Sequence, residues 1–209
     1  MPSLNAIIRD HAPVLVVDTA SLRVQAGLCE ADGRNRWITR NEEPGAALFR
    51  ALAELEVNLN TVGAFVFCDG PGSVLGIRSA AMAIRVWQTL RPRPAFAYSS
   101  LALVAAALGR AEITVIADAR RDSWHCQQLG GGRFRRPTSG LAGELVTPEY
   151  FRSWSVPPAT VTNTPYAIPD LWAAAATEDL LRATEAPDAF LAEEPSFAPW
   201  SVRIHRAPG

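Results

Sequence analysis

The sequence contains no lysine, since all 20 of its basic residues are arginines. This absence excludes two classes of mechanism, because a P-loop needs a phosphate-binding lysine and aldolase or pyridoxal-phosphate chemistry needs a Schiff-base lysine. The 20 basic residues are balanced by 21 acidic ones, which leaves a net charge of −1. No overall field therefore draws the chain towards nucleic acid or a membrane, and any such contact must come from a local patch.

Cysteine and histidine are also scarce, with three residues of each. Cys29, Cys68 and Cys126 include no C-x-x-C pair, which excludes a disulfide framework and a zinc ribbon. The adjacent His125 and Cys126 fall on a predicted strand, so their side chains should point to opposite faces. We therefore expect neither a His–Cys dyad nor a His-based metal site.

Long apolar runs are missing as well. No run approaches the roughly 20 residues that span a bilayer, and the first residues lack the apolar core of a signal peptide. We therefore expect a soluble, cytoplasmic protein without a membrane contact. Apolar residues make up 48% of the chain and charged residues 20%, which is typical of a globular fold of one large or two small lobes.

The first half of the chain predicts a mixed α/β lobe. The apolar run Val14 to Val17 is typical of a buried strand and ends at Asp18. A later helix begins at Pro44 and carries leucines at 48, 52, 55 and 59, spaced as on one helical face. The other predicted elements are strands over 22–29, 36–39, 64–68 and 95–98, a helix over 74–90 and a helix from Ser99 or Ser100 to Gly109.

The second half partly repeats this pattern. An apolar strand over 114–117 ends in Asp118, as the first strand ends in Asp18, and strands over 123–129 and 133–136 follow. This weak internal duplication predicts two lobes, over residues 1–108 and 109–209. Beyond residue 150 only 177–186 has the pattern of a good helix.

The loop Gly70-Pro71-Gly72-Ser73 lies between a predicted strand and a predicted helix. Its glycines allow backbone N–H groups to converge and Ser73 can cap the helix, which is the pattern of an anion site. A tight, ordinarily capped turn explains the same residues. Asp18 and Asp118, each at the end of a strand, could hold a hydrated metal beside the N–H groups of a hairpin, but an aspartate in this place often simply starts a turn.

A cluster of arginines falls on the strands and hairpin of the second half. Together they predict a basic patch for phosphate, with a solvated hairpin as the alternative. Its members are Arg120, Arg121, Arg133, Arg135 and Arg136.

The helix over 74–90 is apolar nearly all round, with little polar face beyond Arg78, Arg85 and Gln88. Such a helix is covered on both sides, and one sheet covers only one of them. We therefore expect a partner helix on the other side, and we expect Ala81→Arg to abolish association while leaving the fold intact. Burial by the preceding helix alone is the alternative.

Four segments together resemble the TsaB (YeaZ) family, the small subunit in bacterial synthesis of threonylcarbamoyladenosine on tRNA. They are Val14–Thr19, Cys68–Arg78, Ser99–Leu101 and Asp118–Arg121. The match covers residue 13 to about residue 130, in the family's order and spacing. The resemblance implies an α/β fold of the ASKHA (actin/Hsp70-like ATPase) type, with mixed sheets in two lobes.

The resemblance also implies a function. The chain would be a non-catalytic subunit, required with the TsaD paralogue for threonylcarbamoyl transfer to the adenosine next to the anticodon. The implied partners are a TsaD-like large subunit, a TsaE-like ATPase and, as an option, a second copy of this chain, with tRNA bound only indirectly. No tightly bound cofactor is implied, although ATP or ADP and Mg²⁺ could bind at the interface of the complex.

Two sets of site residues follow from the motifs and the resemblance, and neither contains a catalytic or metal-binding residue. The partner interface is expected on the helices over 44–58 and 74–90, at Leu48, Leu52, Leu55, Ile77, Ala80, Ala81, Ile84 and Trp87. The nucleotide or phosphate contacts are expected at Asp18, Thr19, Gly70, Gly72, Ser73, Arg78, Asp118 and Arg120.

Two other functions stay open at this point. One is a small ASKHA enzyme that acts alone, a kinase or a glycoprotease-type hydrolase, which would need a complete nucleotide cleft. The other is a self-associating scaffold, because an apolar docking face can pair with its own copy. ATP turnover by the purified chain would favour the enzyme.

Overall fold

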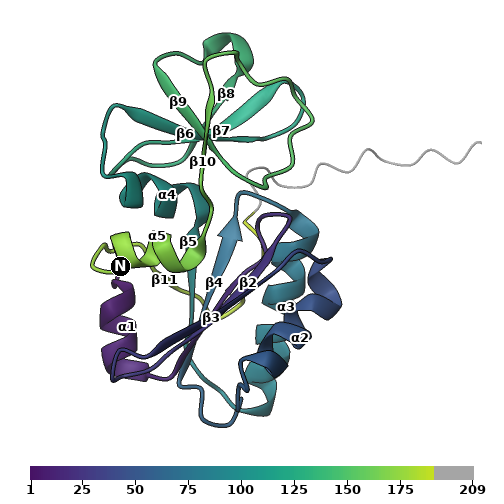
Figure 1. Cartoon of the computed structure of the whole chain (residues 1–209), viewed down its shortest axis with the longest axis vertical. Coiled ribbons are helices and arrows are strands. Elements are labelled where there is room, and N and C mark those ends of the chain that lie inside the picture. Colours follow the sequence, from purple (N-terminus) through teal and green to yellow (C-terminus); the bar gives the residue numbers. More distant parts are fainter. Residues whose placement is uncertain (191–209) are drawn as a thin grey trace, which may run out of the picture.

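The computed structural model describes residues 1–190, which form two stacked α/β lobes (Figure 1). The lower sheet in the figure consists, in spatial order, of β11 (Arg182–Ala183), β5 (Ala95–Ser99), β4 (Ala64–Gly70), β1 (Val14–Asp18), β2 (Val24–Cys29) and β3 (Asn35–Arg40). The upper sheet consists of β10 (Thr162–Thr164), β9 (Glu144–Pro148), β6 (Ile113–Asp118), β7 (Ser123–Gln127) and β8 (Phe134–Pro137). Each sheet combines an antiparallel meander with parallel neighbours, which confirms the predicted α/β class with mixed sheets.

Helices cover both faces of the lower sheet. Those of the described residues are α1 (Leu4–His11), α2 (Pro44–Glu54), α3 (Val74–Leu90), α4 (Ser100–Leu108) and α5 (Ile168–Ala175), together with a short 3₁₀ turn, η1 (Thr138–Gly140). Leu15 and Val17 of β1 belong to the same apolar cluster as α2 and α3, whereas Val14 and Val16 belong to the cluster of α1, α4 and α5. Because both faces of β1 are covered, the strand is a continuous apolar run without alternation.

The two helices on the first face differ in how well the sequence predicts them. The helix predicted over 74–90 is confirmed as α3, which begins after Ser73 as N-cap. Helix α2 begins at Pro44 as predicted but ends at Glu54, before the last two leucines of the apolar pattern. Glu56 adopts a left-handed backbone with φ of 52°, which no helix accommodates, so the chain turns there and Leu59 packs from a loop.

Helix α4 lies between the two lobes (Figure 1). Ser99 caps it and Gly109, with φ of 63°, ends it in the left-handed conformation, as the sequence predicts. Its apolar side chains join strands of both sheets in one cluster that includes Val16 of β1 and Val115 of β6. The two lobes therefore share a continuous core.

The last part of the described chain returns to the first lobe. Helix α5 packs beside α4, and β11 pairs antiparallel with β5 at the edge of the lower sheet. The chain enters the upper sheet after α4, next to the predicted boundary of 108/109, but residues 168–183 contribute to the lower lobe. The rest of the predicted second lobe, from residue 191 on, lies outside the described residues.

The helix predicted over 177–186 is wrong. The structure has α5 at Ile168–Ala175 instead, followed by a turn and the short strand β11. Pro169 suits the first turn of a helix and the alanines after Trp172 favour its continuation, while the polar residues after Ala176 end it. Leu181 of the predicted helix is instead buried in an extended segment, where it donates its backbone N–H to the Pro2 carbonyl.

Three further elements are absent from the predicted pattern. They are α1, β9 and β10, each short and each stabilised by distant parts of the chain. Strand β10, for example, is held at the edge of the upper sheet by its parallel pairing with β9. Within residues 1–190, no helix combines the length and the apolar composition that crossing a bilayer requires.

Candidate functional site

The loop from Gly70 to Ser73 joins β4 to α3 and lines a cavity of about 260 Å³ between the lobes. The Ser73 hydroxyl oxygen accepts a hydrogen bond from the Gly76 backbone N–H at 3.3 Å, and the Ser73 N–H donates to the Ala20 carbonyl at 2.7 Å. A Cβ on Gly72 would lie 2.4 Å from that same carbonyl oxygen, so only glycine allows this approach. The loop is therefore fixed, with the positive end of α3 beside the cavity.

The upper lobe supplies the opposite wall of this cavity. Asp118 and Arg120 reach it from the β6–β7 hairpin, and Arg133, Arg152 and Trp154 complete it. The Arg120 guanidinium carbon lies 4.4 Å from the centre of the Trp154 ring, a cation–π contact. The three guanidinium groups and the helix N-terminus favour an anion in this cavity, and the carboxylates of Asp69 and Asp118, which also line it, oppose them. The volume lies below the roughly 300–1,000 Å³ of pockets for drug-sized ligands, so the cavity suits a small anion.

The cavity brings together five of the eight residues predicted for nucleotide or phosphate contacts. They are Gly70, Gly72, Ser73, Asp118 and Arg120. Of the predicted basic patch, Arg120 and Arg133 line the cavity. Arg135 instead donates to the Ser123 hydroxyl and the Ala119 carbonyl, and Arg136 donates to the Gly140 carbonyl, so these arginines support the hairpin.

Asp18 lies away from the cavity, in the core. It is fully buried, and its Oδ2 accepts hydrogen bonds from the hydroxyls of Tyr98 and Tyr166 at 2.7 Å each. Its Oδ1 accepts the Ala20 N–H at 3.0 Å. Burial raises the pKa of Asp18 above its ordinary value, although the hydrogen bonds from the two tyrosines act in the opposite direction. Its predicted contact with phosphate is not formed within this chain, because both oxygens are occupied and shielded from solvent.

Thr19 and Arg78 also lie outside the cavity. Thr19 is buried. A Cβ added to Gly76 would lie 2.3 Å from the Thr19 carbonyl oxygen, so Thr19 packs closely against the start of α3. Arg78 lines the groove between α2 and α3 and forms an ion pair with Asp188 at 3.8 Å. The motifs predicted a common site for these residues, but Thr19 and Arg78 do not line the cavity.

Asp118 both accepts the hydrogen bond of a turn and lines the cavity. Its Oδ2 accepts the backbone N–H groups of Trp154 and Ser155 at 2.7 and 2.5 Å, and its Oδ1 accepts the Arg120 N–H. Burial acts to raise the pKa of Asp118, but the N–H donors of Ser155, Arg120 and Trp154 outweigh it and hold the pKa below its ordinary value. The carboxylate therefore stays charged and fastens the loop around residue 154 to the hairpin.

The donor set does not fit a Mg²⁺ ion held by this chain. Among the residues that the structure describes, no group of three or more His, Cys, Asp or Glu side chains could hold a metal. The two aspartates that open the hairpins already accept hydrogen bonds on both oxygens. A hard cation would have to displace these donors to obtain its oxygen ligands.

The second candidate site is a surface of α2 and α3. All eight residues predicted for a partner interface are buried within this chain, where they pack the two helices on the sheet. The apolar side chains that these helices do expose are different ones, and three of them, Phe49, Met82 and Val86, line a groove of about 450 Å³. Ala81 belongs to the core, so the expected effect of Ala81→Arg on association alone does not fit this structure.

A signal in the sequence separates these two sets. Ile77, Ala80, Ile84 and Trp87 recur at intervals of three and four residues, which places them on the inner face of α3. Met82 and Val86, four residues apart, fall on the opposite face. The phase of the pattern, rather than its overall apolar content, identifies the outer face. Arg152 and Trp154 of the first site had no comparable signal, because they lie in an irregular segment.

Comparisons with known proteins identify the fold. No protein-family model and no curated protein sequence matches this chain. Solved structures do match: YeaZ from Pseudomonas aeruginosa is 23% identical with a TM-score of 0.60, over 85% of this chain and 99% of that one. An uncharacterized protein with similarity to peptidase YeaZ, from Pseudomonas aeruginosa, is 22% identical with a TM-score of 0.58, over 77% of this chain and 88% of that one.

The chain has the fold of YeaZ, which is of the actin/Hsp70-like ASKHA type. This confirms the fold class that the sequence resemblance implies. The likeness extends beyond the part of the chain that carries the resembling motifs, which ends at about residue 130.

Proposed function

We propose that this chain is a non-catalytic TsaB-like subunit that binds a TsaD-like large subunit. In this role it is required for threonylcarbamoyl transfer to the adenosine next to the anticodon of tRNA, without binding tRNA itself. The proposal includes a TsaE-like ATPase as a second partner and a homodimer as an alternative use of the same surface. The YeaZ fold and the four resembling segments support this choice.

The observation that carries the proposal is the exposed apolar face of α2 and α3. Phe49, Met82 and Val86 are 58%, 57% and 52% exposed, and they lie around one groove. Burying the exposed part of these side chains favours association by about 25 cal/mol for each Å² of apolar surface removed from water, so neighbouring ones form a surface that a partner can use. On α3 the groove begins at Arg78, about one helical turn beyond the N-cap Ser73.

The cavity beside the loop Gly70–Ser73 has a supporting role in this proposal. Asp18 and Asp118 are occupied by donors of this chain, so ATP or ADP with Mg²⁺ at the interface would take its metal ligands from the large subunit. The loop N–H groups and Arg120 could contact a phosphate from this side. This chain would then shape the junction without carrying out the chemistry.

The test uses Met82→Arg, which places a charge in the groove without touching the core, since Met82 is 57% exposed. Val156→Arg is the matched control, because Val156 is 84% exposed and lies in the upper lobe. Purified wild type should form a complex with the TsaD-like subunit in analytical ultracentrifugation. Met82→Arg should weaken that complex at least tenfold and Val156→Arg should not, while both keep the wild-type circular dichroism spectrum.

The same variants test the cellular role. Deletion of the gene should remove threonylcarbamoyladenosine from total tRNA, as measured by mass spectrometry of digested nucleosides. The wild-type chain and Val156→Arg should restore it, and Met82→Arg should not. Unchanged nucleoside levels in the deletion strain would overturn the proposal, and ATP turnover by the purified chain alone would support the stand-alone enzyme instead.

A further inference from the structure

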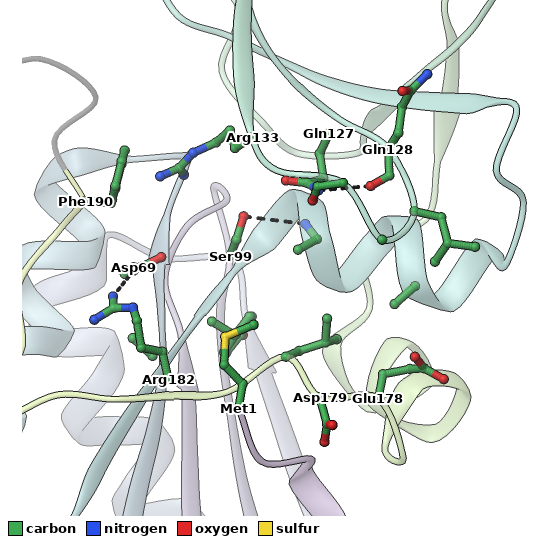
Figure 2. Close-up of a pocket in the computed structure, with 18 residues that line it drawn as sticks. Met1, Asp69, Ser99, Gln127, Gln128, Arg133, Glu178, Asp179, Arg182 and Phe190 are labelled. Atoms are coloured by element: carbon green, nitrogen blue, oxygen red, sulfur yellow. Dashed lines mark hydrogen bonds and ion pairs between the residues drawn. The ribbon is translucent and has the colours of Figure 1, made fainter.

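A larger cavity adjoins the first one at the junction between the lobes and shares Asp69, Arg133 and Phe190 with it. It measures about 890 Å³, within the range of pockets for drug-sized ligands. Its walls come from β5, α4, the turn after β7 and the segment that leads into β11 (Figure 2). Most of its lining residues, those of α4, β5 and the segment before β11, take no part in the first site.

One wall of this cavity is apolar. Ala102 and Ala106 lie one turn apart on α4 and face it, and their small side chains leave the space open. Leu129 and Leu180 border the same space from the upper lobe and from the segment before β11. An apolar body in this space would lose its contact with water, which favours binding by about 25 cal/mol for each Å² buried.

The inner end of the cavity carries an excess of positive charge. The buried Asp69 accepts a hydrogen bond from Arg182 at 2.8 Å. Burial raises the pKa of Asp69 above its ordinary value, while the charges of Arg182 and then Arg133 act in the opposite direction. Two guanidinium groups thus share one carboxylate, which leaves one positive charge without a counterpart. Figure 2 shows Arg133 above Asp69, between Phe190 and Ser99.

Arg133 is the group best placed to hold an anion. Its Nη1 is buried and has no hydrogen-bond partner among the described residues, and the guanidinium carbon lies 3.6 Å from the centre of the Phe190 ring. A buried N–H group without a partner is costly, and a ligand oxygen would satisfy it. Glu178 and Asp179 are exposed and lie on the opposite side of the cavity from Arg133 (Figure 2).

We propose that this cavity binds a small molecule with an apolar, ring-sized body and one anionic group, with Arg133 holding the anion. The apolar wall of α4 and Phe190 would contact the body. A guanidinium group binds planar carboxylates with two parallel hydrogen bonds, so an aromatic or alicyclic carboxylic acid fits best.

A pair of fluorescent probes tests the two halves of this proposal on the full chain. The anionic probe is 8-anilinonaphthalene-1-sulfonate, and N-phenyl-1-naphthylamine is the same ring system without the sulfonate. We expect the chain to bind the anionic probe about tenfold more tightly than the neutral one, because a charge-assisted hydrogen bond favours the anion by about that factor.

Three variants locate the binding. Arg133→Gln should weaken the anionic probe about tenfold and leave the neutral probe unchanged, whereas Arg9→Gln, which removes an exposed arginine of α1, should change neither. Ala102→Phe fills the cavity and should abolish binding of both probes. If Ala102→Phe does not fold, the contrast between Arg133→Gln and Arg9→Gln still tests the role of Arg133.

Equal affinities of wild type and Arg133→Gln for the anionic probe would overturn the proposal. The probe would then occupy another surface, such as the groove of α2 and α3.

Competition separates an apolar acid from a bare anion. 1-Naphthoate should displace the anionic probe from the wild-type chain, and inorganic phosphate at the same concentration should not. Displacement by phosphate as strong as that by 1-naphthoate would show a simple anion site and contradict the proposed apolar body.

Discussion

Asp18 and Asp118 occupy the same place in the two lobes, yet they have opposite surroundings. Each is the last residue of the first strand of an antiparallel meander, and each begins a hairpin. Asp18 is sealed from solvent by the hydroxyls of Tyr98 and Tyr166. Asp118 stands at the wall of a cavity and accepts backbone N–H groups.

A repeated local pattern therefore says little about a site. The strand and the turn follow from the residues around each aspartate, but its chemistry depends on what the rest of the chain places beside it. Tyr166 is 148 residues away from Asp18, and it arrives with the segment that returns to the lower lobe. Asp18 therefore accepts hydrogen bonds within the core, whereas Asp118 lines the cavity between the lobes.

The largest effect is expected from removing the sealed aspartate. Asp18→Ala should lower the free energy of unfolding by about 3 kcal/mol, because two buried tyrosine hydroxyls lose their acceptor. Asp118→Ala should cost only about 1 kcal/mol, since water can reach its donors. Urea unfolding followed by circular dichroism measures both values. Equal losses would contradict the contrast between the two lobes.

A smaller difference is expected between two glycines. Gly72→Ala should destabilise the fold by about 2 kcal/mol, because the new Cβ would lie 2.4 Å from the Ala20 carbonyl oxygen and force the loop away. Gly130→Ala in the upper lobe meets open space and should cost about 1 kcal/mol through its φ of 68° alone. The midpoints of thermal unfolding compare the two, and a larger loss at Gly130 would argue against a fixed loop.

Removing a single donor to Asp18 should have a still smaller effect. Tyr166→Phe should cost about 1.5 kcal/mol, because Asp18 keeps the hydroxyl of Tyr98. Tyr150→Phe is the matched control, since Tyr150 is exposed and should change stability by less than about 0.5 kcal/mol. Urea unfolding of the two variants side by side tests this, and the same loss in both would show that the hydroxyl of Tyr166 contributes nothing.

The finest test is the sign of the pH dependence. The pKa of Asp18 is raised above 3.8, so its contribution to stability is full below that value and is lost as pH rises through the folded pKa. The pKa of Asp118 is lowered, so its contribution is full above 3.8 and is lost as pH falls through the folded pKa. Relative to Asp18→Asn, wild type should therefore lose stability as pH rises, and relative to Asp118→Asn it should lose stability as pH falls. Urea unfolding between about pH 3 and about pH 7 measures the two slopes, and slopes of the same sign would refute the contrast between the two aspartates.

The parts of the fold that the sequence predicted best are those with strong local signals. Helix α3 has an N-cap at Ser73 and a long apolar pattern, and α4 has both a serine cap and a closing glycine. Strands β1 and β6 are apolar runs that end at an aspartate. Elements that depend on distant partners were missed, among them α1, β10 and the true position of α5.

The candidate sites were predicted only in part, for the same reason. The loop from Gly70 to Ser73 follows from its residues, because glycine, proline and a capping serine determine it locally. The residues that face this loop could not be predicted in the same way. Arg152 and Trp154 come from an irregular segment, and Asp18 is buried beneath Tyr98 and Tyr166, which lie far from it in the chain.

By itself, then, the sequence determined the α/β alternation, the caps and turns, and the two aspartates at the strand ends, since each depends on neighbours within a few residues. The tertiary structure alone decided which aspartate is shielded from solvent, which residues of the upper lobe face the loop Gly70–Ser73 and where two arginines lie beside Asp69. Burial and charge balance are properties of groups that meet in space, and here those groups lie as far apart in the chain as Asp18 and Tyr166.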